Sequence, residues 1–129
     1  IKACEAVLAA GHVLLMAPEG TRSRDASLQV GKEGLAFVAR KSDPIIVPVA
    51  ITGSTALTAS FKRLRPVPVH LRYGTPFRFR WPEGKLTREH LRLQTDAAMS
   101  RVAGLLPPEM RGVYRDPQPE WETWLRLAA

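Results

Sequence analysis

The chain has 129 residues, 45% of them hydrophobic, and this size and composition predict one globular domain with an apolar core. Its formal net charge of +7 favours anionic partners such as phosphorylated metabolites, coenzyme phosphates, acidic lipid headgroups or nucleic acid, without choosing among them. The single cysteine excludes an internal disulfide, and no apolar run approaches the roughly 20 residues that span a bilayer, so we expect no transmembrane helix.

The first predicted elements are a helix and a strand. Residues 1–10 have helical spacing of apolar side chains, and Cys4 lies on the apolar face, where a packed thiol is expected. Gly11 follows at the position where a left-handed residue would end the helix. Residues 12–17 are apolar without alternation, which predicts a central strand covered on both faces in a parallel sheet. Pro18 ends that strand.

A polar loop, a helix and a second strand follow. Residues 19–30 are too hydrophilic to be core and are expected to form an exposed, ligand-accessible loop. Residues 33–41 have helical spacing, and residues 45–51 form a β-branched apolar run. A helix between two buried strands implies a βαβ unit. Pro48 removes one ladder donor, so an edge, a bulge or a turn is expected in the second strand.

The second half of the chain predicts further strands and the longest helix. Residues 67–73 alternate and predict a third strand, with residues 77–81 as a short extension. Residues 87–106 follow helical spacing, and Thr87 is the expected N-cap. Together these elements predict an α/β fold with a mixed, partly parallel sheet flanked by helices.

Two segments carry aromatic residues whose surroundings are open to more than one interpretation. Residues 56–65 are predicted to be a short helix or loop with a basic rim, which suits an anionic membrane surface or a simple solvated face; the side chains concerned are Phe61, Lys62, Arg63 and Arg65. In the tail, residues 116–129, a short helix places Trp121 and Trp124 on one side. We expect these two indoles to pack against the domain.

The polar residues directly after the first predicted strand form a candidate phosphate site. Arg22 offers a planar fork that suits a phosphate, and Arg24 adds positive field. Thr21 and Ser23 supply hydroxyls that can bond phosphate or sugar oxygens. Ligand sites in open α/β sheets lie at such strand ends, so chemistry is expected here.

Two neighbours of these residues have other expected roles. Gly20 allows the backbone to turn where a side chain would obstruct a ligand. Glu19 beside a phosphate is repulsive unless it accepts from a substrate hydroxyl or holds Arg22 in position. The alternative is a solvated turn with an ion pair between Glu19 and Arg22.

The stretch Ala17-Pro18-Glu19-Gly20-Thr21-Arg22-Ser23 resembles the Phe-Pro-Glu-Gly-Thr-Arg-Ser signature of the glycerophospholipid acyltransferases. The likeness extends to Gly31-Lys32-Glu33-Gly34 and to Ile46-Val47-Pro48-Val49-Ala50-Ile51, which is similar to a Val-Pro-Val strand of that family. Residues 105–114 are similar to the closing segment of many bacterial members.

The resemblance implies an enzyme that moves an acyl group from acyl-CoA or acyl carrier protein to a hydroxyl of a glycerol phosphate acceptor, in phospholipid synthesis. It implies that Glu19, Gly20, Thr21 and Arg22 bind the acceptor, within a glycerol-3-phosphate acyltransferase-like fold. Lys32, at a helix N-terminus, is a further candidate for a phosphate of the acceptor or of CoA, with a plain surface lysine as the alternative. No metal or cofactor beyond the acyl donor is expected, and nucleic acid is not an expected partner. A peripheral location on the cytoplasmic face of the membrane is expected.

The chain departs from the family pattern in two ways. Ala17 replaces the signature Phe, which removes an apolar wall. The His-x-x-x-x-Asp motif of the family's general base has no match, because His12 and His70 lack a suitably spaced Asp and His90 lies one residue too far from Asp96. No catalytic residue is therefore expected in this chain. It is interpreted as an incomplete, C-terminal part of an acyltransferase domain that supplies the acceptor-binding half and is inactive alone.

Two other interpretations remain open at the level of sequence. A non-catalytic module could bind phosphorylated lipid or another polyanion through the same basic side chains. A degenerate relative that has lost its catalytic half is the second.

Overall fold

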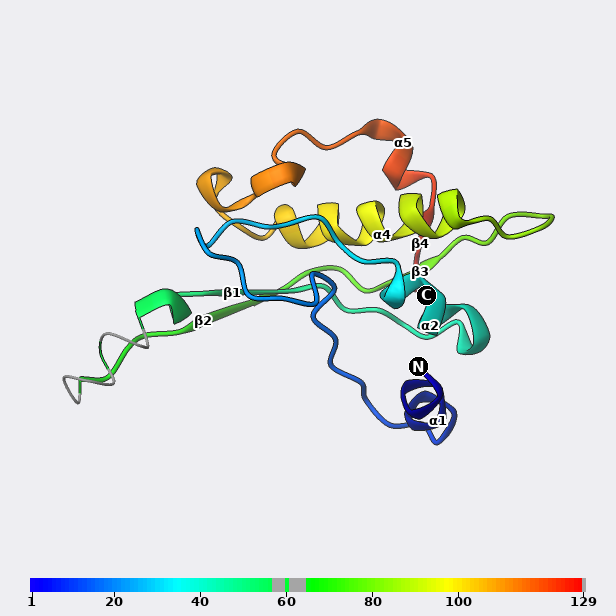
Figure 1. The fold of residues 1–129 in the computed structure, drawn as a ribbon, viewed down its shortest axis with the longest axis horizontal. Helices are drawn as coiled ribbons and strands as arrows, with labels where there is room; N and C mark the ends of the chain where they lie inside the picture. Colours follow the sequence, from blue (N-terminus) through cyan, green and yellow to red (C-terminus); the bar gives the residue numbers. More distant parts are fainter. Residues whose placement is uncertain (57–59, 61–64, 129) are drawn as a thin grey trace.

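The computed structural model describes residues 1–56, 60 and 65–128. Figure 1 shows one long helix, α4 (Arg88–Ala103), with two small sheets and the shorter helices arranged around it. The strands β1 (Val49–Thr52) and β2 (His70–Tyr73) form one antiparallel pair. The strands β3 (Phe77–Phe79) and β4 (Leu125–Leu127) form another. The fold is therefore mixed α and β, as predicted in general terms.

The other helices and 3-10 turns with bounds in the described residues are short. They are α1 (Lys2–Ala9), α2 (Gly34–Ser42), α5 (Pro119–Glu122) and the 3-10 turns η1 (Ser54–Ala56), η2 (Pro108–Met110) and η3 (Gly112–Tyr114). Helix α2 packs three buried residues into the core. The predicted helices over residues 1–10 and 33–41 are thus confirmed. Gly11 has a φ of +76°, so the predicted left-handed end of α1 is also confirmed. No described helix is long and apolar enough to cross a membrane.

The longest helix is fixed at its N-terminus by a capping box. Thr87 Oγ1 accepts from the backbone N–H of His90 at 3.3 Å, and His90 Nδ1 accepts from the Thr87 N–H at 3.2 Å. These bonds satisfy donors that a helix start leaves without partners. The predicted N-cap is confirmed, and His90 has a structural role.

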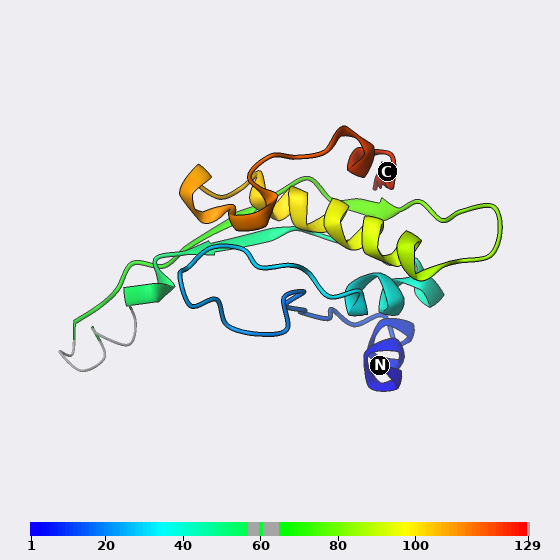
Figure 2. The ribbon, with the colours of Figure 1, turned by 45° about the horizontal axis from the view of Figure 1, so that its top comes forward.

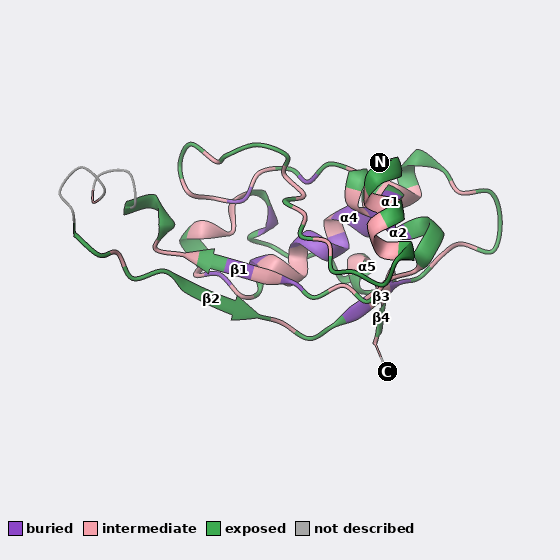
Figure 3. Cartoon of the chain, turned by 90° about the horizontal axis from the view of Figure 1, so that it is seen from below, coloured by how far each residue is buried: buried purple, intermediate pink, exposed green. Residues whose placement is uncertain are grey.

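Small residues let α4 approach its neighbours closely, and this makes it the centre of the core. Ala97, Ala98 and Ala103 are all buried on it. One cluster forms around Phe77 and Phe79 of β3, whose rings meet edge to face at 5.8 Å. Figure 3 shows how the buried residues concentrate on and around α4.

The second cluster joins the C-terminal half of α4 to two segments far away in sequence. It contains six buried side chains, namely Leu28, Ala50, Met99, Ala103, Leu106 and Tyr114. Trp121 packs against both clusters, and Trp124 packs against the first. The expectation that these indoles pack onto the domain is confirmed.

The predicted first strand does not form. Residues 12–17 belong to no helix or strand and have no strand partner among the described residues, and Val13 and Leu15 are 95% and 87% exposed. Without a neighbouring strand, the N–H and C=O groups of this segment have no ladder to join. The βαβ unit is therefore wrong for the described structure, and the parallel sheet is not confirmed because both sheets are antiparallel.

Pro48 divides the predicted second strand, as its irregularity suggested. Before Pro48, Ile46 exchanges two hydrogen bonds with Phe77, at 2.8 and 2.9 Å. The carbonyl of Pro48 accepts from the N–H of Gly74 at 2.9 Å, and β1 starts at the next residue. One apolar run thus pairs with β3 before Pro48 and with β2 after it.

Several predicted bounds are corrected in the second half. The third strand is confirmed but is shorter than residues 67–73, and the predicted extension over residues 77–81 is a separate strand only over Phe77–Phe79, which pairs with β4 of the tail. The tail strand β4 was not predicted. Helix α4 ends at Ala103, before the prolines expected to stop it. Residues 57–59 and 61–64, which include Phe61, Lys62 and Arg63 of the predicted basic rim, lie outside the described residues, and Arg65 of that rim is exposed.

Candidate functional site

The candidate site is built on a tight turn at the start of the polar loop. The N–H of Gly20 donates to the carbonyl of Ala17 at 3.0 Å, which closes the turn. Gly20 has a φ of +65°, a conformation that disfavours any residue with a Cβ. Figure 2 shows the loop leaving the body of the molecule after this turn and returning to α2.

Two hydrogen bonds close the base of this loop. Oε2 of Glu19 accepts from the N–H of Gln29 at 2.7 Å, and the carbonyl of Pro18 accepts from the N–H of Lys32 at 2.8 Å. Glu19 therefore ties the two limbs of the loop together. It makes no ion pair with Arg22 in the part of the chain that the structure describes, so the predicted intraloop pair is wrong.

Lys32 lies directly over Gly20. A Cβ added to Gly20 would stand 3.0 Å from Nζ of Lys32 and 3.1 Å from its Cδ. The glycine is thus needed for its backbone conformation, and it also leaves room for this side chain. Two residues that the sequence analysis named separately are brought together here, with the lysine still exposed to solvent.

The outer part of the loop is organised by Asp25. Its Oδ1 accepts from the hydroxyls of Ser23 and Ser27, both at 2.8 Å, and from the N–H of Ser27 at 3.1 Å. The Ser27 hydroxyl, followed by that of Ser23, lowers the pKa of Asp25. Ser23, predicted as a ligand hydroxyl, is thus engaged within the loop. Ala26 has a φ of +60°, which the bonds on either side of it sustain.

The two arginines of the loop point their charge at solvent. Arg22 and Arg24 are exposed and make neither an ion pair nor a side-chain hydrogen bond with any described residue. Thr21 is exposed beside them. With Lys32, this gives three cationic side chains within one loop and its closing residue. The only carboxylates of the same loop, Glu19 and Asp25, are occupied by hydrogen bonds to it.

The N-terminus of α2 already has an anion of its own. Glu33 is the N-cap, and hydrogen bonding to its own backbone N–H is the main cause that lowers the pKa of its carboxyl group. Arg88 of α4 lies 3.5 Å away, between Nε and Oε1. An anionic ligand at this helix end, as predicted, would therefore compete with the carboxylate of Glu33.

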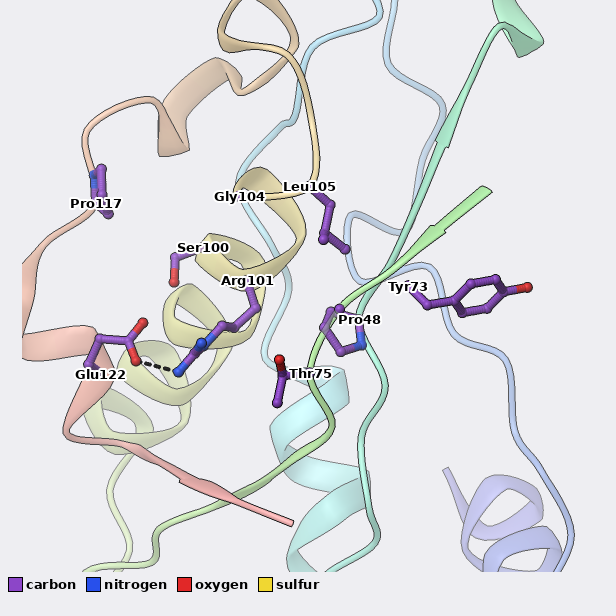
Figure 4. A pocket seen from close by; sticks show the side chains of 10 residues that line it. Pro48, Tyr73, Thr75, Ser100, Arg101, Gly104, Leu105, Pro117 and Glu122 are labelled. Atoms are coloured by element: carbon purple, nitrogen blue, oxygen red, sulfur yellow. Dashed lines mark hydrogen bonds and ion pairs between the residues drawn. The ribbon is translucent and has the colours of Figure 1, made fainter. Parts of the chain in front are cut away.

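The other candidates do not join the loop. His12 and His70 are exposed, and His90 caps α4. Within the described ranges, no group of three His, Cys, Asp or Glu side chains could hold a metal ion. A hollow of about 490 Å³ between β2, α4 and α5 is drawn in Figure 4, where Arg101 pairs with Glu122. None of the predicted site residues lines it.

Sequence reasoning missed the residues that hold the loop in shape. An acceptor followed two residues later by Ser, as in Asp25 and Ser27, is a local turn signal that could have been used. The hydrogen bond from the N–H of Gly31 to the hydroxyl of Tyr114 joins residues 83 positions apart, and no local pattern announces it.

Comparison with known proteins shows that the loop lies in a part of the chain that matches a known protein family. Residues 1–52 match the sequence model of the family described as Acyltransferase. The chain is 33% identical over 122 residues to a 1-acyl-sn-glycerol-3-phosphate acyltransferase of Chlamydomonas reinhardtii, which covers 93% of this chain and 34% of that protein. It is 44% identical over 64 residues to a protein of the same name from Limnanthes douglasii, covering 49% of this chain and 23% of that protein.

A third protein of the same name, from Cocos nucifera, is 35% identical over 75 residues, which are 57% of this chain and 24% of that protein. The chain therefore spans at most about a third of the length of these relatives. All three are eukaryotic, so they do not support the bacterial source that the closing segment suggested. No solved structure matches the chain.

Proposed function

This chain belongs to the acyltransferase family, and from that premise we propose that it supplies the acceptor-binding half of an enzyme that acylates a glycerol phosphate lipid. The proposed acceptor is a 1-acylglycerol-3-phosphate, the compound in the names of the relatives. One observation carries the proposal. Within the segment that matches the family, the side chain of Lys32 lies against Gly20, and Arg22, two residues after that glycine, is exposed and makes no ion pair with a described residue.

The proposed binding role follows from the chemistry of these side chains. The guanidinium of Arg22 and the ammonium of Lys32 would hold the phosphate, and the hydroxyl of Thr21 would bond a phosphate or glycerol oxygen. Gly20 would keep the loop in its turn and leave room for the side chain of Lys32. Glu19 would act by keeping the loop closed through its bond to Gln29, and its charge would help to exclude a second anion.

The proposed reaction joins the acceptor hydroxyl to the acyl carbonyl of a thioester, on acyl-CoA or acyl carrier protein. The hydroxyl loses its proton to a general base, the new ester bond forms, and the thiol of the donor leaves with a proton. We propose that the base lies outside these 129 residues, because none of the three histidines has an aspartate at the spacing of the family's His-x-x-x-x-Asp motif. This chain would bind and orient the acceptor, and it would be inactive alone.

The enzyme is proposed to work peripherally on the cytoplasmic face of a membrane, where a lipid acceptor resides. The net charge of +7 supports this, since basic proteins are attracted to anionic lipid surfaces. A second candidate is a non-catalytic module that binds phosphorylated lipid. The exposed cations would serve this module as well as they would serve the enzyme. No histidine among the described residues is paired with an aspartate, which also fits a module without catalysis.

The experiment uses the full-length protein, acyl-CoA and two acceptors that differ only in the phosphate, 1-acylglycerol-3-phosphate and 1-acylglycerol. We expect release of CoA, with kcat/KM for the phosphorylated acceptor higher by roughly tenfold or more, as one charge-assisted bond provides. Equal rates with both acceptors would contradict the phosphate role. Binding of the phosphorylated acceptor without CoA release would support the non-catalytic module.

A further inference from the structure

The returning limb of the loop is bonded alternately to two different parts of the molecule. The N–H groups of Gln29 and Lys32 point to the signature turn, where they donate to Glu19 and Pro18. The N–H groups of Leu28 and Gly31 donate to residues on the other side of the limb. This five-residue limb, residues 28–32, therefore connects the candidate site to the segment bonded to its opposite side.

The opposite side is held by the segment that follows α4. The N–H of Leu28 donates to the carbonyl of Met110 at 3.0 Å, and the carbonyl of Leu28 accepts from the N–H of Val113 at 3.3 Å. The N–H of Gly31 donates to the hydroxyl of Tyr114 at 3.0 Å. Three bonds thus fasten the limb to residues 110–114.

The hydroxyl of Tyr114 is itself oriented by a chain of polar contacts. It donates to Oδ1 of Asp96 at 2.8 Å, and Oδ2 of Asp96 accepts from Nε of Arg92 at 3.1 Å. Because the hydroxyl proton goes to the carboxylate, its lone pairs are left to accept from the N–H of Gly31. Tyr114 is 3% exposed, and burial raises its pKa to about 12, so the hydroxyl is protonated near neutral pH.

Two glycines make this close approach feasible. A Cβ on Gly31 would lie 2.8 Å from Met99 Cγ and 2.8 Å from Thr95 Cγ2, so the limb rests directly on α4. Gly112 has a φ of +51°, and a Cβ there would lie 2.0 Å from the carbonyl oxygen of Leu28. The contact between the limb and the segment after α4 is therefore backbone against backbone.

We infer that Tyr114 is a positioning residue of the acceptor site, which acts through Gly31 on the backbone that carries Lys32 and anchors Glu19. The inference rests on the proposed function for its consequence in binding. Residues 110–114 and the signature turn hold the two sides of one five-residue limb, so loosening one side loosens the other. Tyr114 itself touches neither the acceptor nor the donor in this account.

The test uses Tyr114→Phe in the full-length protein, which keeps the ring and removes the hydroxyl. We expect amide hydrogen exchange of residues 28–32 to become faster by about tenfold, as the loss of one buried hydrogen bond predicts. We also expect KM for 1-acylglycerol-3-phosphate to rise about fivefold, with KM for acyl-CoA within about twofold of the wild type. Tyr73→Phe is the matched control, because Tyr73 is 67% exposed and its hydroxyl bonds to no described residue.

The outcomes separate this inference from the function on which it rests. Unchanged exchange of residues 28–32 in Tyr114→Phe overturns the inference. Faster exchange with both KM values unchanged also overturns it, while the proposed function stands if Arg22→Ala weakens use of the phosphorylated acceptor. If Arg22→Ala changes nothing, the acceptor site and its positioning residue fall together.

A second variant guards against a folding defect in the first. Asp96→Ala removes the acceptor that orients the Tyr114 hydroxyl and leaves the aromatic ring in place. It should shift exchange and acceptor KM in the same direction as Tyr114→Phe. Asp116→Ala, at an exposed aspartate, is the control and should leave both unchanged. The inference would be overturned if Asp96→Ala left exchange and acceptor KM unchanged, or if Asp116→Ala shifted them as much.

Discussion

Gly31 is the residue at which the candidate loop meets the core, and its lack of a side chain is a structural requirement. Gly31→Ala would place a Cβ 2.8 Å from both Met99 Cγ and Thr95 Cγ2 on α4. Overpacking of this kind costs about 1–3 kcal/mol, and we expect the free energy of unfolding in urea to fall by that amount. Gly84→Ala is the control, since nothing lies within 4 Å of a Cβ there. Equal stability of Gly31→Ala and the wild type would contradict the packing described.

Asp25 gives the outer loop a predicted dependence on pH. Hydrogen bonds from the hydroxyls of Ser27 and Ser23 hold the pKa of Asp25 below 3.8 in the folded loop. A carboxyl whose folded pKa is lowered contributes stability above its unfolded pKa and loses it as pH falls through the folded value. We therefore expect the amide resonance of Ser27 in NMR spectra to move to its disordered position only below pH 3.8. Asp25→Asn should show that position already at pH 6. An amide shift of Ser27 that titrates above pH 3.8 would refute this.

At the level of single residues, the sequence pointed to chemical groups but not to the contacts that each one makes. Gly20, Arg22 and Lys32 were named from their chemistry, and the structure brings the glycine and the lysine into contact. The role of Glu19 was missed because its partner is a backbone N–H ten positions away. Backbone partners carry no residue type, so they leave no mark in a sequence.

Among the elements, the helices were predictable because their signals are local. Thr87 and the helical spacing after it were sufficient to place α4, whose cap the structure confirms. The strands were less predictable, since β3 pairs with the tail strand β4 and Ile46 pairs with Phe77. Such pairings depend on segments far apart in the chain, which periodicity within one segment does not report.

The cap of α4 allows a direct measurement at this scale. Thr87→Ala removes the side-chain acceptor for the N–H of His90 and should lower the free energy of unfolding by about 1 kcal/mol. Thermal and urea unfolding followed by circular dichroism would measure it. Thr75→Ala is the control, because Thr75 is exposed and its hydroxyl bonds to no described residue. Loss of stability in both variants to the same degree would mean that the cap contributes nothing specific.

For the whole molecule, the general class was predictable and the sheet was not. The unbroken apolar run at residues 12–17 is typical of a buried parallel strand, yet Val13 and Leu15 are exposed. The face of the β1–β2 pair that carries Ile51, Leu71 and Tyr73 is also exposed, by half or more. Apolar periodicity shows which residues favour burial, but it does not show which other segment packs against them.

The link between Tyr114 and Gly31 gives the whole molecule a predicted response to alkaline pH. Burial raises the pKa of Tyr114 to about 12, from 10 when the tyrosine is free. A group with a raised folded pKa contributes stability that is complete below pH 10 and is lost as pH rises through 12. We therefore expect the free energy of unfolding in urea to fall more steeply between pH 10 and 12 in the wild type than in Tyr114→Phe. Identical slopes would contradict the buried hydroxyl.

The central claim is that Arg22 binds the phosphate of a lipid acceptor, and the most direct measurement compares two acceptors in the full-length protein. Arg22→Ala should lower kcat/KM for 1-acylglycerol-3-phosphate by roughly 30-fold, equivalent to about 2 kcal/mol for a charged hydrogen bond. The same variant should leave kcat/KM for 1-acylglycerol within about twofold of the wild type. Arg40→Ala, at an exposed arginine of α2, should change neither. An equal loss with both acceptors, or no loss with either, would contradict the claim.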